Sequence, residues 1–124
     1  MSKKLLVVDD FNTMRRMVIK MLKEIGFDDI VEASDGAIAF EKLQENEIDM
    51  IISDWNMPNM TGIELLEKVR STEKYQGLPF VMVTAEGQKE QVIEAVKMGV
   101  TGYIIKPFTA DVLKEKIGDI FPDE

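Results

Sequence analysis

Five short apolar runs, separated by segments with helical periodicity, constrain the fold of this chain more than any other feature. The runs are rich in β-branched residues and too short for buried helices, and three of them are continuous, as strands covered on both faces are. They comprise Leu5–Val8, Ile30–Val31, Met50–Ile52, Phe80–Val83 and Tyr103–Ile105. The pattern predicts five strands, each followed by a helix.

The segments between the runs repeat apolar residues at intervals of three and four, which is typical of amphipathic helices. In the first segment, we expect the following stripe to face the core: Met14, Met17, Val18, Met21, Leu22 and Ile25. Two later segments begin with capping signals. Thr61 with Glu64 three residues later predicts a capping box, and Thr109 is the expected cap of the last helix.

Alternation of strands and helices predicts a mainly parallel sheet with right-handed crossovers and helices on both faces. The 124 residues suffice for one core, whereas a closed eight-fold barrel would need about twice that length. We therefore expect one α/β domain over residues 1–124, without a separate output domain. In such open sheets, ligands bind at the carboxyl ends of the strands.

Histidine and cysteine are both absent from the sequence. The chain therefore lacks a thiolate nucleophile, a histidine base and the usual ligands of zinc and haem. Twenty-three acidic and 15 basic residues give a net charge of -8, which argues against binding to nucleic acid or anionic membranes. We find no signal peptide and no apolar run near the ~20 residues of a membrane span, and we expect a soluble cytoplasmic protein.

Four of the five predicted strands end in a polar or ionisable residue: Asp9-Asp10, Asp54, Thr84 and Lys106. Crowded carboxylates repel one another, and a divalent cation removes the conflict. Because all of these ligands are oxygens, Mg²⁺ or Mn²⁺ is favoured over zinc. A lysine and a hydroxyl nearby suit a phosphoryl group, and aspartate can form an aspartyl phosphate. The constellation predicts metal-dependent phosphoryl transfer onto a carboxylate.

Four segments of the sequence resemble the receiver domain of two-component response regulators, and in particular the chemotaxis regulators of that family. They are Asp9-Asp10, Ser53–Pro58, Thr84–Glu86 and Gly102–Phe108. The resemblance, which covers essentially the whole chain, implies a flavodoxin-like (βα)5 fold, a doubly wound parallel sheet with strand order 2-1-3-4-5. It also implies a monomeric signalling switch rather than an enzyme, one that catalyses only its own phosphorylation and slow autodephosphorylation.

The same resemblance implies that Asp54 is the phosphoacceptor and that a sensor histidine kinase is the donor. Mg²⁺, for which Mn²⁺ would substitute, would be held by Asp9, Asp10, Asp54 and Asn56. Lys106 would pair with a phosphoryl oxygen, and the peptide bond after it would be cis. Two residues would tune the lifetime of the phosphoryl group: Asn56 and Glu86.

Thr84 would hydrogen-bond the phosphoryl group, and Tyr103 would then turn inward into the space that Thr84 leaves. In the resembling family, the output surface binds a flagellar motor switch protein and changes flagellar rotation. Carried over by position, that surface comprises Lys89, Val92, Tyr103 and Lys116. This sequence departs from the family there, since Gly87-Gln88-Lys89 is less basic than the usual run and Pro122 ends the last helix early. A phosphatase is a further expected partner.

Three other functions compete with this interpretation. A stand-alone receiver could act as a phosphorelay shuttle or phosphate sink without binding the motor. An aspartate-nucleophile phosphatase generally needs a second acidic group two residues after the nucleophile, where this chain has Asn56. A flavin-binding module needs a phosphate loop rich in glycine and hydroxyl groups after the first strand, where this chain has Asp9-Asp10-Phe11-Asn12.

Overall fold

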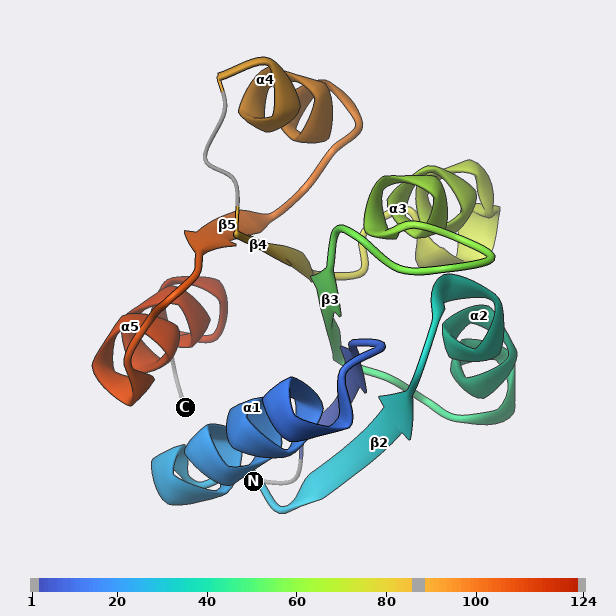
Figure 1. The fold of residues 1–124 in the computed structure, drawn as a ribbon. Helices are drawn as coiled ribbons and strands as arrows, with labels where there is room; N and C mark the ends of the chain where they lie inside the picture. The colour runs from blue at the N-terminus through green and yellow to red at the C-terminus, as the bar shows by residue number, and fades with distance from the viewer. Residues whose placement is uncertain (1–2, 86–88, 123–124) are drawn as a thin grey trace.

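The computed structural model describes residues 3–85 and 89–122, which form a sheet with helices on both faces (Figure 1). The strands are β1 (Lys4–Val8), β2 (Asp29–Ala33), β3 (Met50–Asp54), β4 (Phe80–Thr84) and β5 (Gly102–Ile105). The helices are α1 (Asn12–Ile25), α2 (Gly36–Glu45), α3 (Gly62–Ser71), α4 (Lys89–Lys97) and α5 (Ala110–Ile120), and a short 3-10 helix, η1 (Glu73–Tyr75), precedes β4.

The five strands lie in the order β2-β1-β3-β4-β5, and every neighbouring pair is parallel. This confirms the predicted α/β class, the doubly wound topology and the strand order. The register places Val8 beside Ser53, Asp54 beside Val83, and Thr84 beside Ile105. The carboxyl ends of β1, β3, β4 and β5 therefore meet at one edge of the sheet.

Alternate residues of each central strand pack on opposite faces of the sheet, as the pleat requires. In β1, Leu5 and Val7 pack in the core on the side of α1 and α5, whereas Leu6 and Val8 pack in the core on the side of α2 and α3. Figure 1 shows these two groups of helices on opposite sides of the sheet. Every residue of β3 and β4 is buried, which explains why their sequences are apolar without alternation.

The apolar stripe of α1 is only partly core. Val18 and Leu22, which lie one turn apart, are the buried residues of the helix, and Met17 is 46% exposed. The expectation that the whole stripe faces the core was therefore wrong for Met17. Only part of the apolar face of α1 is buried, and Met17 lies beside that part and stays exposed.

The predicted helix caps are confirmed. Thr61 Oγ1 accepts a hydrogen bond from the Glu64 backbone N–H at 3.3 Å, and Glu64 Oε1 accepts one from the Thr61 N–H at 2.9 Å. Thr109 likewise accepts a hydrogen bond from the N–H of Val112.

In the part of the chain that the structure describes, no helix has the length and apolar composition needed to cross a bilayer.

Candidate functional site

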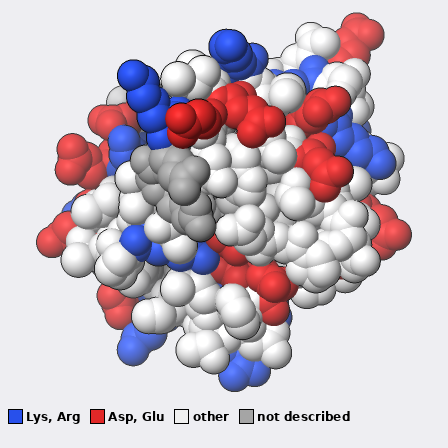
Figure 2. All heavy atoms as spheres, turned by 45° about the horizontal axis from the view of Figure 1, so that its top comes forward, with Lys and Arg blue, Asp and Glu red and all other residues white. Residues whose placement is uncertain are grey.

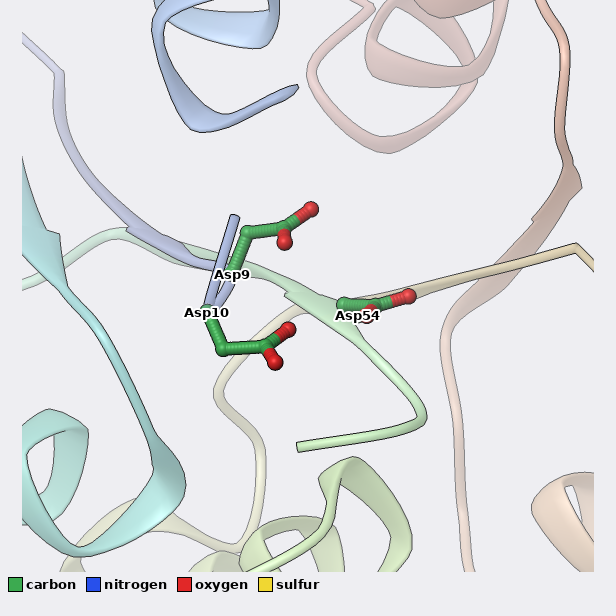
Figure 3. A group of neighbouring side chains, drawn as sticks. All are labelled: Asp9, Asp10 and Asp54. Atoms are coloured by element: carbon green, nitrogen blue, oxygen red, sulfur yellow. The ribbon is translucent and has the colours of Figure 1, made fainter. Parts of the chain in front are cut away.

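Three carboxylates meet at the edge where β1 and β3 end. Asp9 and Asp10 follow β1, Asp54 is the last residue of β3, and one oxygen of each lies within 4.8 Å of the others. Figure 3 shows the three side chains gathered at the ends of these two strands. Asp9 and Asp54 are buried, with exposed fractions of 3% and 7%, whereas Asp10 is more open to solvent.

Lys106, the residue after β5, brings a positive charge to this group. Its Nζ lies 3.0 Å from Oδ1 of Asp54 and 3.6 Å from Oδ2 of Asp9. Burial nevertheless raises the pKa of Asp54, although the Lys106 ammonium group opposes this shift and the nearby Asp9 charge adds to it. One cation thus compensates only part of the charge of three crowded carboxylates.

The residues fit a hard divalent cation. Oδ1 of Asp10 is out of contact with solvent and has no hydrogen-bond partner among the described residues. A buried carboxylate oxygen without a partner is costly, and coordination to a cation would satisfy it. The donor set consists of oxygens alone, as Mg²⁺ and Mn²⁺ prefer.

The turn that carries Asp9 and Asp10 is held from two sides. Oδ1 of Asp9 accepts a hydrogen bond from the Phe11 N–H at 2.9 Å, and the carbonyl of Asp9 accepts one from Arg15 Nη1 at 2.7 Å. The same guanidinium donates to Glu32 at 2.8 Å and to Asn12 at 2.6 Å. Arg15 therefore ties the aspartate turn to α1 and to β2. The basic residues of α1 gave no indication of this role in the sequence.

Thr84 and Tyr103 lie next to the acidic group on the two strands beyond β3. Thr84, the last residue of β4, is completely buried, and its side chain is hydrogen-bonded to that of Tyr103 in β5. Burial raises the pKa of the Tyr103 hydroxyl, and this hydrogen bond opposes the rise. The two side chains are in contact, and the roles expected for Thr84 and Tyr103 stay predictions.

The loop from β3 to α3 carries Asn56, which is exposed. Gly62 closes the loop: its N–H donates to the Trp55 carbonyl at 2.8 Å, and a Cβ at this position would lie 2.3 Å from the carbonyl oxygen of Asp54. Only glycine allows α3 to begin so close to the end of β3.

The peptide bond between Lys106 and Pro107 is cis, as the resemblance implied.

The predicted partner surface is distributed over α4, β5 and α5. Lys89 is an exposed residue at the start of α4, and Val92, Tyr103 and Lys116 are partly buried. Glu86, expected to influence the phosphoryl lifetime, lies outside the described residues. Figure 2 shows Lys and Arg side chains scattered among Asp and Glu on the face that it presents, without one continuous basic area.

The family profile described as "Response regulator receiver domain" matches residues 5–118. The chain is 52% identical over 118 residues to "Chemotaxis protein CheY" of Pseudomonas aeruginosa. This alignment covers 95% of each protein. It is 51% identical to "Chemotaxis protein CheY-3" of Vibrio cholerae, over 95% of this chain and 91% of the relative.

A solved structure of chemotaxis protein CheY4 from Vibrio cholerae superposes with a TM-score of 0.90 at 37% sequence identity. The alignment covers 97% of this chain and 99% of the CheY4 chain. The likeness therefore extends over nearly the whole of both chains.

Proposed function

Because the chain belongs to the response regulator receiver family and is a chemotaxis response regulator, we propose that Asp54 accepts a phosphoryl group from the histidine of a sensor kinase. The observation that carries this proposal is the contact of Lys106 with Asp54 beside two further carboxylates. Such a protein is a phosphorylation-dependent signalling switch rather than an enzyme that turns over a metabolite.

In the proposed reaction, an Asp54 carboxylate oxygen forms a bond to phosphorus while the bond from phosphorus to the donor imidazole nitrogen breaks. Mg²⁺ bound at Asp9, Asp10, Asp54 and the Asn56 carbonyl would neutralise charge on the phosphoryl oxygens. Lys106 lies 3.0 Å from the acceptor carboxylate, and it would contact a phosphoryl oxygen. The raised pKa of Asp54 leaves its carboxylate more basic than an ordinary aspartate.

The signal would leave the site through Thr84 and Tyr103. A phosphoryl group on Asp54 would draw the Thr84 hydroxyl toward it and away from Tyr103, to which it is now hydrogen-bonded. Tyr103 would then occupy the space that Thr84 leaves. The two arrangements need differ by only a few kcal/mol for phosphorylation to shift the balance between them.

The expected target is a flagellar motor switch protein, which would bind the surface of α4, β5 and α5. Exposed apolar side chains support this surface, since Val96 of α4 and Ile105 of β5 are 63% and 50% exposed. Within the described residues of α4, only Ala95 is buried, so this helix can shift without breaking a large core contact. Polar members of the surface would be Lys89 and Lys116.

We also propose that residues 1–124 act as one receiver domain and that the protein is a cytoplasmic monomer. A receiver of this kind passes its signal on by binding. The chemotaxis histidine kinase and the motor switch are the expected partners, and a phosphatase is a third.

The test is a phosphotransfer assay with a sensor kinase or a small phosphodonor in the presence of Mg²⁺. Trp55 follows Asp54 directly and is buried, so its fluorescence should be quenched when the wild-type protein is phosphorylated or binds beryllofluoride. The Asp54→Ala variant should show no such change. An unresponsive wild-type protein, or an undiminished response in the variant, would contradict the assignment. Binding of a motor switch peptide only in the phosphorylated state would exclude a relay or sink role.

A further inference from the structure

The loop between β3 and α3, residues 55–61, is fixed at both of its ends. Trp55 donates its N–H to the carbonyl of Val83 at 3.1 Å, and the Trp55 carbonyl accepts the Gly62 N–H at 2.8 Å. Between these points the loop extends from the edge of the sheet toward the start of α2 (Figure 1). Asn56, a proposed cation ligand through its carbonyl, lies in this loop.

The far end of the loop is attached to the first turn of α2. Asn59 has a positive φ of 65°, and its Nδ2 donates a hydrogen bond to Oδ2 of Asp35 at 2.9 Å. Next to it, the Met60 carbonyl accepts the Gly36 N–H at 3.2 Å. A Cβ at Gly36 would lie 2.8 Å from the Met60 carbonyl oxygen, so α2 approaches the loop as closely as its backbone allows.

Asp35 uses its two carboxylate oxygens for two different elements. Oδ1 accepts the Ile38 N–H at 2.9 Å and caps α2, whereas Oδ2 accepts the Asn59 amide of the loop. The residue is 6% exposed, so water does not readily replace either partner. These hydrogen bonds also hold the pKa of Asp35 below its ordinary value. One buried side chain thus joins a helix start to the loop.

We propose that Asp35 is a positioning residue: through Asn59 it fixes the loop that carries Asn56, and thereby sets the affinity of the site for a divalent cation. This inference rests on the proposed function, because it assumes that the cation binds beside Asp54. Asp35 itself does not contact the cation. Its effect is to restrict the conformations of the loop before binding, so that less order has to be imposed when the cation arrives.

The two-sided use of Asp35 allows a selective substitution. In Asp35→Asn, the remaining side-chain oxygen can still cap α2, because asparagine caps helices as well as aspartate does. The new amide replaces the carboxylate that accepts from Asn59: either two donors face each other, or the Asn59 amide turns over and a weaker hydrogen bond between neutral groups replaces the charge-assisted one. The variant therefore keeps the helix cap and weakens the attachment of the loop.

The double variant Asp35→Asn, Asn59→Asp reverses donor and acceptor. The introduced amide can donate to the introduced carboxylate, and the net charge equals that of the wild type. Asp28→Asn is the matched control for loss of one negative charge, because Asp28 is an exposed residue before β2 and has no part in the loop.

The experiment is a calorimetric titration of the four proteins with Mg²⁺ alone, without a phosphodonor, together with their thermal unfolding. We expect Asp35→Asn to bind Mg²⁺ about three-fold to ten-fold more weakly, at or below the lower limit for direct outer-shell partners. The double variant should recover most of this loss, and Asp28→Asn should bind like the wild type. Recovery in the double variant separates a positioning role from a general loss of stability.

Wild-type affinity in Asp35→Asn would overturn the inference while leaving the proposed function in place. Failure of the double variant to recover Mg²⁺ affinity would overturn it as well. If the wild-type protein itself did not bind Mg²⁺, the proposed function would fail and this inference with it. The wild-type titration therefore distinguishes the two failures.

Discussion

Replacing Asp54 by asparagine should stabilise the protein at neutral pH when no divalent cation is present. The substitution keeps the shape of the side chain and removes one of three carboxylates whose oxygens lie within 4.8 Å of one another. It also removes the partner of Lys106 at 3.0 Å, although Lys106 retains Asp9 at 3.6 Å. The sign of the effect depends on which of these losses is larger.

The distances give an estimate of the balance. With an effective dielectric constant of about 20, two unit charges at the 4.8 Å upper limit repel by ~3.5 kcal/mol, so the two neighbouring carboxylates cost Asp54 at least ~7 kcal/mol. The attraction between Asp54 and Lys106 at 3.0 Å stabilises the folded state by ~5.5 kcal/mol. The difference is therefore at least ~1.5 kcal/mol, and the desolvation of Asp54 adds to it, so the Asp54→Asn variant should be the more stable protein.

The same reasoning predicts how the difference depends on pH. Burial raises the pKa of Asp54, so the folded protein holds this proton more tightly than the unfolded chain does. The resulting stabilisation is present below the ordinary pKa of aspartate and is lost as the pH rises through the raised pKa of the folded state. The advantage of Asp54→Asn should therefore be small in acid and reach its full size at neutral pH.

Urea unfolding of both proteins, at acidic and neutral pH and with and without Mg²⁺, measures these effects. Mg²⁺ binds only the folded state, and it should raise the free energy of unfolding of the wild type more than that of the variant. The reasoning would be refuted if Asp54→Asn were the less stable protein at neutral pH without Mg²⁺. An equal stabilisation of both proteins by Mg²⁺ would refute the assignment of Asp54 to the cation.

Three further predictions concern the close approach of α3 to β3, a guanidinium near the end of α3, and the lysine of the site. Gly62→Ala places a Cβ 2.3 Å from the Asp54 carbonyl oxygen and should lower the free energy of unfolding, measured in urea, by about 1–3 kcal/mol. The control Gly77→Ala has open space around it and should leave this free energy unchanged, and equal stabilities of the two variants would contradict the close approach. Arg70→Lys should lower the free energy of unfolding by about 1–3 kcal/mol, because the Arg70 guanidinium donates to three separate oxygens that an ammonium group cannot reach together. An unchanged midpoint of urea unfolding would contradict this prediction. Lys106→Ala should slow phosphorylation by a small donor roughly ten-fold or more while strengthening Mg²⁺ binding, as followed by Trp55 fluorescence; a wild-type rate would argue against its role.

The site's composition could be predicted from the sequence because it depends on the ends of strands. Once the apolar runs are assigned to a parallel sheet, the residues that follow them must lie at one edge, and Asp54 and Lys106 are brought together without any knowledge of side-chain geometry. The continuous runs likewise predicted that β3 and β4 are buried on both faces. Both inferences use periodicity and topology alone.

The contacts that position the site could not be predicted in this way. Arg15 belongs to the basic side of α1, and nothing in that pattern indicates that its guanidinium reaches the Asp9 carbonyl. The Asp35 carboxylate meets Asn59 from 24 positions away in the chain, and the meeting depends on the left-handed backbone of Asn59. The exposure of Met17 has a similar origin, since periodicity gives the direction of an apolar face but not the width of its contact.

The ion pair between Lys106 and Asp54 joins residues 52 positions apart in the chain. Asp54 ends β3 and Lys106 follows β5, and these two strands do not pair directly, because β4 lies between them. The Asp54 carboxylate and the Lys106 ammonium group can therefore meet only after three strands have assembled in register. A chain cleaved before β5 would keep its three carboxylates and lose the lysine, so phosphate acceptance reports on the assembly of the whole sheet. In a folding experiment, recovery of this activity should coincide with the last strand to dock.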